Sequence, residues 1–218
     1  MDKNAFKIVL IGDSGVGKTS IAFWLVFNKR NIDYASTIGG AFMAKDITIP
    51  IKTKNEGEVL EKIRFNIWDT AGQERYRSIA KIYYKNTIGC VCVFDVTNRD
   101  SFIHLDRWVN DYLENNILPN YTIILVGNKA DHHISQWKIT KAEIKEFTEK
   151  YHCEYTLTNC ITGDGVQETF IILAKSIIDK NDIPLTGVEY KLLDKEESTG
   201  IINLATRVTS ISKPNCPC

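Results

Sequence analysis

The chain has 218 residues, and its 27 Lys and Arg balance its 27 Asp and Glu, so the formal net charge is zero. A chain of this length can bury a sizeable core without disulfide staples. Because the charge is balanced, no long-range field draws the protein to nucleic acid or to an anionic membrane, and we expect no nucleic-acid partner. Six scattered cysteines do not form a disulfide scaffold and favour a reducing compartment.

The first predicted strand, residues 6–11, runs into the stretch GDSGVGKTS, and a helix is predicted over residues 17–27. This stretch matches the pattern G-x-x-x-x-G-K-[ST] in the strand-to-helix setting that the pattern requires. Backbone N–H groups of such a loop form a nest for phosphate oxygens, to which Lys18 adds charge and Thr19 a magnesium ligand. An ordinary strand-to-helix turn is the alternative, which the flanking structure disfavours. The predicted nucleotide-contacting residues of this loop are Asp13, Ser14, Gly15, Val16, Gly17, Lys18, Thr19 and Ser20.

Two further strands are predicted at residues 41–50 and 63–68. The polar linker KTKNEGE between them reads as an exposed turn, which predicts an antiparallel hairpin at the edge of the sheet.

The segments on either side of this hairpin carry residues suited to the last phosphate of a triphosphate. Thr37 in STIGG can offer its hydroxyl to magnesium and its N–H to the γ-phosphate. In WDTAGQERYRS, Asp69 can hold magnesium through water, the Gly72 N–H can meet the γ-phosphate, and Gln73 can orient an attacking water. Because contacts to the γ-phosphate vanish when it leaves, these segments predict a conformational switch.

The rest of the chain alternates strand-like and helix-like patterns, which predicts a parallel α/β sheet wrapped by helices. In the last helix, apolar residues recur every three or four positions and predict one buried stripe. The predicted strands are residues 88–94, 122–126 and 154–157, and the predicted helices are residues 101–114, 140–151 and 166–180.

The stretch ILVGNKAD places Asn128, Lys129 and Asp131 at the carboxyl end of a buried strand, where open parallel sheets bind ligands. A carboxylate only accepts hydrogen bonds and therefore suits guanine, whose N1–H and amino group both donate, whereas adenine would present an acceptor. A polar loop is the alternative for this short motif alone. Together with the phosphate loop, it predicts a guanine nucleotide.

After Lys180 the pattern changes to scattered charges and chain breakers. We therefore expect residues 1–180 to form the folded domain and residues 181–218 a flexible tail, with a reach of about 35 Å. The chain ends in CPC, and Asn215 stands where a C-a-a-X box would need its cysteine. Cys216 and Cys218 are lipidation candidates, and a metal or redox pair is the alternative.

Residues 5–180 and the last three residues together resemble the Ras superfamily of small GTPases, and more closely its Rab family. The resemblance rests on GDSGVGKTS, STIGGAF, WDTAGQERYRS, YYKN, GNKAD and the terminal CPC. It implies a phosphate-loop G domain with a six-stranded, mostly parallel sheet, one antiparallel edge strand and helices on both faces. Its implied ligands are GTP or GDP and Mg²⁺. The segments IGGAF and NKAD resemble most the early-endosomal branch of the Rab family.

The same resemblance implies slow GTP hydrolysis with Lys18 and Gln73 as catalytic residues. It also implies a monomer that meets an exchange factor, a GTPase-activating protein and effectors, and that recruits effectors in vesicle trafficking. Two geranylgeranyl groups on Cys216 and Cys218 would hold it at the cytoplasmic face of intracellular membranes, between periods in the cytosol. The implied effector-reading aromatic triad is Phe42, Trp68 and Tyr83, for which packing at the sheet edge is an equal alternative.

The chain also departs from the family pattern. Asn159, Cys160 and Ile161 occupy the usual S-A-K loop, so the Cys160 N–H is left to meet the guanine oxygen, without the loop's lysine. Ile32 aligns best with the aromatic that covers the base. These departures keep open a nucleotide-filled scaffold with little turnover. A small-molecule kinase is a further alternative, but no arginine-rich lid accompanies the phosphate loop.

Overall fold

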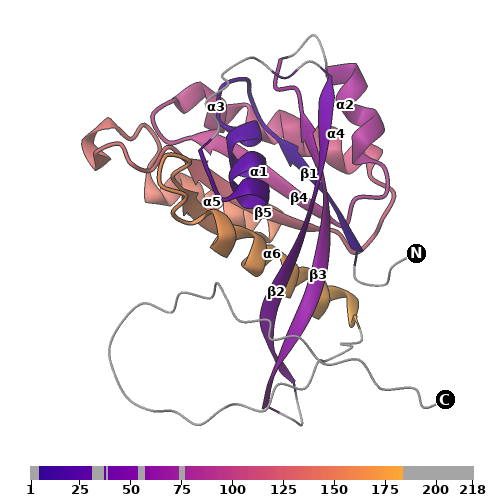
Figure 1. The fold of residues 1–218 in the computed structure, drawn as a ribbon. Helices are drawn as coiled ribbons and strands as arrows, with labels where there is room; N and C mark the ends of the chain where they lie inside the picture. Colours follow the sequence, from indigo (N-terminus) through magenta and orange to yellow (C-terminus); the bar gives the residue numbers. More distant parts are fainter. Residues whose placement is uncertain (1–4, 31–36, 38, 54–56, 74–76, 184–218) are drawn as a thin grey trace, which may run out of the picture.

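Six strands form one sheet in the order β2-β3-β1-β4-β5-β6, as the ribbon in Figure 1 shows. The computed structural model describes residues 5–30, 37, 39–53, 57–73 and 77–183. The strands are β1 (Ala5–Ile11), β2 (Gly40–Thr53), β3 (Gly57–Thr70), β4 (Gly89–Asp95), β5 (Thr122–Asn128) and β6 (Glu154–Thr158).

All neighbouring strands are parallel except β2, which pairs antiparallel with β3 at the edge. The predicted α/β class and its antiparallel edge strand are therefore confirmed. Every residue of β4 and β5 is buried, because helices cover both faces of a parallel sheet and such strands read as continuous apolar runs. The carboxyl ends of β1, β3, β4, β5 and β6 consequently meet at one edge of the sheet.

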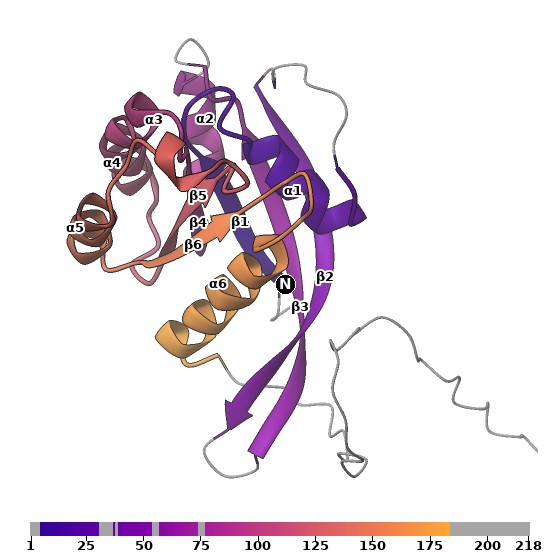
Figure 2. The same cartoon turned by 90° about the vertical axis from the view of Figure 1, so that its left-hand side faces the viewer.

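Helices pack on both faces of the sheet (Figure 2), and each face has its own core. One core contains Ile21 and Leu25 of α1 together with the predicted apolar stripe of α6. All five residues of that stripe are buried: Val166, Phe170, Leu173, Ala174 and Ile177. The other core contains Tyr84 of α2, Trp108 of α4 and Phe147 of α5. The helices are α1 (Lys18–Phe27), α2 (Arg77–Tyr84), α3 (Arg99–Ile103), α4 (Leu105–Asn115), α5 (Lys141–Tyr151) and α6 (Val166–Asn181), and a 3₁₀ turn spans Ile134–Gln136.

Two helix predictions need correction. The single helix predicted over residues 101–114 is wrong: α3 and α4 meet at His104, whose N–H donates to the Asp100 carbonyl while its own carbonyl accepts from Arg107 and Trp108. Helix α2 was not predicted at all. Its sequence shows no clear amphipathic pattern, because the apolar residues Ile79 and Ile82 face solvent while Ala80 and Tyr84 are buried.

The edge hairpin is longer than the sequence predicts. β2 and β3 stay paired as far as Thr53 and Gly57, so the predicted seven-residue turn shrinks to residues 54–56, which lie outside the described residues. The described pairing of β1 with β3 covers only Arg64–Asp69. Beyond it, Ile47–Thr53 and Gly57–Ile63 form a two-stranded ribbon, here called the arm, which extends past α6 in both views (Figures 1 and 2).

We expect Phe170→Ala to lower the free energy of unfolding by about 3–5 kcal/mol, because the fully buried ring packs edge-on against Phe65 and its removal leaves a cavity. Chemical denaturation of the GDP-bound protein measures this loss. Phe27→Ala is the matched control, since Phe27 is half-exposed, and should cost less than about 1 kcal/mol. Equal losses in the two variants would contradict the assigned core.

Candidate nucleotide-binding site

The phosphate loop connects β1 to α1 and has a backbone that only glycine fits at two points. Gly12 and Gly17 have φ angles of 135° and 102°, in the left-handed region. A Cβ on Gly12 would overlap the Val93 carbonyl of β4, and one on Gly17 would overlap the Asn128 amide nitrogen of β5. The motif glycines therefore let the loop press against the ends of two neighbouring strands.

Lys18 lies within this loop and is only 5% exposed. Its Nζ donates to the carbonyls of Gly12 and Asp13, at 2.8 and 2.7 Å. Burial lowers the pKa of Lys18 to about 8, although the charges of Asp69 and Asp13 act in the opposite direction. Burial thus makes the charged form of the Lys18 amine less favourable than in water, and an anion beside it would stabilise that form.

Three hydroxyl and carboxylate groups converge next to Lys18. The Thr19 hydroxyl donates to Asp69 Oδ2 at 2.6 Å and lies 2.8 Å from the Thr37 hydroxyl. Asp69 is fully buried, and its Oδ1 has no hydrogen-bond partner among the described residues. Burial raises the pKa of Asp69, while Thr19, Lys18 and Thr37 oppose the rise.

This set of groups fits Mg²⁺. Hydroxyl and carboxylate oxygens are the hard ligands that magnesium takes, usually with several waters retained. A bound divalent cation or its water would satisfy the buried Oδ1 of Asp69 and offset the cost of burying the carboxylate. Thr19 begins α1, Asp69 ends β3, and Thr37 precedes β2, so only the fold brings the three predicted ligands together.

Gly72 and Gln73 follow β3 and border the same place. A Cβ on Gly72 would overlap both the Lys18 ammonium and the Asp13 carbonyl. The segment after β3 is therefore pressed against the phosphate loop at Gly72. Gln73 is the next residue and is half-buried.

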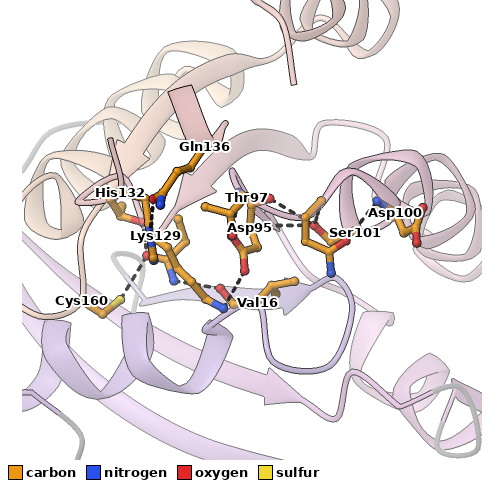
Figure 3. A network of polar contacts seen from close by, with 12 residues as sticks. Val16, Asp95, Thr97, Asp100, Ser101, Lys129, His132, Gln136 and Cys160 are labelled. Atoms are coloured by element: carbon orange, nitrogen blue, oxygen red, sulfur yellow. Dashed lines mark hydrogen bonds and ion pairs between the residues drawn. The ribbon is translucent and has the colours of Figure 1, made fainter. Parts of the chain in front are cut away.

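Asn128, Lys129 and Asp131 follow one another at the end of β5 and are here called the base-side motif. Asn128, which is only 2% exposed, joins this motif to the phosphate loop. Its Nδ2 donates to the Val16 carbonyl at 2.8 Å, and its Oδ1 accepts from the Thr158 hydroxyl at 3.0 Å. Figure 3 shows Lys129 directed at Asp95, with Val16 beside them, and the ion pair measures 2.6 Å. Burial alone would raise the pKa of Asp95, but hydrogen bonds from Lys129 and Thr97 lower it.

A cavity of about 240 Å³ lies between the phosphate loop and the base-side motif. Eight of its lining residues were predicted from the sequence, and Arg30 and His132 were missed. Arg30 carries no local signal, because it simply follows the end of α1, whereas His132 could have been found as the neighbour of Asp131. The residues lining the cavity are Gly15, Gly17, Ser20, Arg30, Asn128, Lys129, Asp131, His132, Cys160 and Ile161.

A second hollow, of about 320 Å³, lies at the opposite ends of β5 and β6. Thr122, Cys153 and Lys180 are among its lining residues, and it contains none of the predicted site residues.

The unusual base loop is braced by its own first residue. Asn159 Oδ1 accepts from the Ile161 N–H at 2.8 Å, and the Asn159 N–H donates to the Asp164 carbonyl at 2.9 Å. Between described residues, no hydrogen bond uses the N–H of Cys160, so that group can meet an acceptor in the cavity. Burial raises the pKa of the Cys160 thiol to about 12, which keeps it neutral.

Asp13 is clamped from outside the loop, a contact that the sequence did not predict. Its carboxylate accepts from Trp108 Nε1 of α4 at 2.8 Å and pairs with His104 Nδ1 at 2.7 Å. His104 and Trp108 lie 91 and 95 residues away from Asp13 along the chain, so no local sequence pattern predicts these contacts. The clamp fixes the loop segment whose carbonyl receives Lys18.

The predicted aromatic triad forms one continuous row across β2, β3 and α2. The ring centroids of Phe42 and Trp68 are 5.2 Å apart, and those of Trp68 and Tyr83 are 4.9 Å apart and stacked. Phe42 is 54% exposed, which leaves its ring open to a partner. The three rings therefore pack against one another at the sheet edge while part of the row remains exposed to solvent.

Three of the residues singled out in the sequence, Ile32, Cys216 and Cys218, lie outside the described residues. Within the described ranges, no helix has the length and apolar character needed to cross a membrane.

The sheet, the glycine-rich loop and the cavity beside it at the carboxyl edge of the sheet are those of a phosphate-loop nucleotide-binding protein. The Ras family profile matches residues 7–179. A "Probable Rab-related GTPase" of Acanthamoeba polyphaga mimivirus is 44% identical over 78% of this chain and 75% of its own length. "Ras-related protein Rab11A" of Lotus japonicus is 36% identical over 92% and 81%, and "Ras-related protein Rab-4" of Dictyostelium discoideum is 33% identical over 97% and 96%.

The chain belongs to the Ras family and, within it, to the Rab-related small GTPases. It is a GTP hydrolase that binds GTP or GDP with Mg²⁺ and acts as a molecular switch in vesicle trafficking. Regulators and effectors are its partners. The nucleotide-filled scaffold without turnover is not favoured.

We expect the affinity of the nucleotide-free protein for GDP·Mg²⁺ to fall about fourfold between pH 7 and pH 8.5, since Lys18, with its pKa near 8, loses its proton over this range. Binding should accordingly take up a proton above pH 8, because the phosphates favour the charged amine. Calorimetric titration in two buffers of different ionisation enthalpy measures both effects. Lys18→Met is the control and should bind weakly without this pH dependence. An identical pH profile in the two proteins would contradict the assignment.

Proposed function

We propose that Lys18 and Gln73 carry the hydrolytic step at this site. The reaction is an in-line attack of water on the γ-phosphorus, in which Gln73 orients the water and Lys18 stabilises charge that develops on the outer phosphates. One observation carries the proposal: Lys18, Thr19 and Asp69 meet in a buried place that Gly72 borders.

Thr19 and Thr37 are the proposed direct magnesium ligands, and Asp69 acts through water. When bound there, Mg²⁺ supplies positive charge that neutralises the phosphate oxygens. The Thr37 and Gly72 N–H groups would then hold the γ-phosphate. Because Thr37 and Gly72 belong to different segments, loss of that phosphate releases both segments together.

The remaining contacts divide between the phosphates and the base. Asp131 accepts from guanine N1–H and its amino group, and the N–H of Cys160 donates to the guanine oxygen. Asn128 and Lys129 support the base from the end of β5, with Asn159 and Ile161 completing the loop. The phosphate-side residues are Asp13, Ser14, Gly15, Val16, Gly17 and Ser20.

Hydrolysis by this site alone is slow, which leaves its timing to an activating protein. An arginine supplied by such a protein accelerates phosphoryl transfer by about 10³ to 10⁵. Slow hydrolysis allows an exchange factor and effectors to act on each state in turn. Phe42, Trp68 and Tyr83 form the proposed effector-contacting row.

We expect Gln73→Leu to keep GTP and GDP affinity within about twofold while lowering activator-stimulated turnover at least 100-fold, because the variant cannot orient the water. Phosphate release under single-turnover conditions measures the rate. Gln167→Leu, an exposed position on α6, is the matched control and should behave like the unmodified protein. If activator-stimulated turnover is unchanged in Gln73→Leu, Gln73 does not orient the attacking water and the proposed role is wrong.

We further propose that residues 1–180 form the catalytic domain and that residues 181–218 are a tail that ends in a lipidated Cys-x-Cys. Two lipid chains give stable membrane attachment where one is marginal. This places a monomeric protein at the cytoplasmic face of intracellular membranes, alternating with a cytosolic state. The endosomal assignment rests on the IGGAF and NKAD segments.

Intact mass after expression in a prenylating host tests the tail. The unmodified chain should carry two isoprenoid groups, Cys216→Ser and Cys218→Ser one each, and the double variant none. Cys160→Ser is the control and should keep both groups, because that thiol is neutral and half-buried in the base loop. A chain without isoprenoid additions would contradict the lipidation proposal and leave the nucleotide site unaffected.

A further inference from the structure

The phosphate loop carries one negative charge of its own, the Asp13 carboxylate, in a place that binds anions. The Asp13 carbonyl accepts from Lys18 Nζ at 2.7 Å, and the charge of Asp13 acts to raise the pKa of Lys18. The carboxylate is therefore close enough to act on Lys18. Because like charges repel, a carboxylate free to turn toward Lys18 would oppose the binding of phosphates there.

Two side chains from the junction of α3 and α4 hold this carboxylate. Trp108 Nε1 donates to Asp13 Oδ1 at 2.8 Å, and His104 Nδ1 lies 2.7 Å from Asp13 Oδ2. A carboxylate only accepts hydrogen bonds, so His104 Nδ1 is the donor in this contact. Each oxygen of Asp13 thus has a donor of its own, while Lys18 Nζ bonds instead to the carbonyls of Gly12 and Asp13.

The break between the two helices sets the position of both donors. His104 ends α3 and begins α4, and Trp108 follows four residues later, so the two side chains share one face of the helix. The Trp108 ring is only 5% exposed and packs in the hydrophobic core under α4. The His104 side chain is 55% exposed. One donor is therefore fixed by the core, and the other lies at the surface.

We propose that Trp108 and His104 are positioning residues for nucleotide binding, which hold the Asp13 carboxylate away from the bound phosphates. Without them the carboxylate would turn toward Lys18, compete for its charge and repel the nucleotide. This inference rests on the proposed binding of the phosphates beside Lys18. Because GTP carries more negative charge than GDP, its retention depends more strongly on the two contacts.

Release of a fluorescent GDP and of a fluorescent, non-hydrolysable GTP analogue from the full-length, magnesium-loaded chain tests the proposal. Trp108→Phe, which removes the indole N–H, and His104→Ala should each speed GDP release about fivefold and release of the GTP analogue more. His104→Asn should return both rates to within about twofold of the unmodified chain, because its amide nitrogen takes the place of Nδ1.

Tyr112→Phe is the matched control for the loss of a buried polar group from α4. The Tyr112 hydroxyl is buried and accepts from Asn116 at 2.9 Å, and none of its hydrogen bonds reaches the phosphate loop. This variant should release both nucleotides at the unmodified rates. Unchanged release in both Trp108→Phe and His104→Ala would overturn the proposal. If Trp108→Phe does not fold, His104→Ala on the exposed side decides.

The charge of Asp13 distinguishes positioning from simple support of the loop. In an Asp13→Asn chain, whatever its own release rates, adding Trp108→Phe or His104→Ala should change them by less than about twofold, because the freed side chain carries no charge. Equal acceleration with and without the carboxylate would overturn the proposal, since α4 would then support the loop by packing alone.

Lys18→Met separates a failure of this inference from a failure of the proposed phosphate site. Weak nucleotide retention in Lys18→Met, together with unchanged release in Trp108→Phe and His104→Ala, would overturn the positioning role and leave the phosphate site intact. Retention that Lys18→Met does not affect would overturn both.

Discussion

The structure depends on the burial of two opposite charges, the Lys18 ammonium and the Asp69 carboxylate, beside the phosphate loop. Burial lowers the pKa of Lys18 and raises that of Asp69, so each charged form is less favourable here than in water. The carbonyls of the loop and the Thr19 hydroxyl offset only part of this cost. A polyphosphate and its metal ion bound at this place would supply the missing partners, which would couple nucleotide binding to the stability of the site.

The parallel sheet supplies the rigidity that this arrangement needs. Strand ends converge at one edge, where Asn128 ties the phosphate loop to the base side and the Trp108–Asp13 hydrogen bond holds the loop from α4. By contrast, Thr37 meets the site through the Thr19 hydroxyl, and Gly72 through close approach to Lys18. Side chains from β5 and α4 thus hold the phosphate loop, whereas Thr37 and Gly72 belong to the segments proposed to respond to the γ-phosphate.

The base side shows how an unusual loop keeps its geometry without the expected lysine. Asn159 braces the loop through its own side chain, and no hydrogen bond between described residues uses the Cys160 N–H. Arg30 and His132 add polar groups to the same cavity. In the arm, Ile47, Ile49 and Ile51 are buried in the same core as residues of α1 and α6, although they lie beyond the described pairing of β3 with β1.

The sequence alone determined the order of strands and most helices, because buried parallel strands appear as apolar runs and α6 carries a clear helical stripe. It also determined the phosphate and base motifs, since these lie on contiguous residues whose spacing reflects local backbone geometry. Helix α2, the break at His104 and the length of the arm were not predictable, because exposed isoleucines and alternating edge strands give ambiguous patterns. Only the tertiary structure brought Trp108 to Asp13 and Arg30 to the cavity. It also brought Thr37 and Asp69 to Thr19. Contacts between residues far apart in the chain depend on how the elements pack, so they leave no mark on local residue spacing.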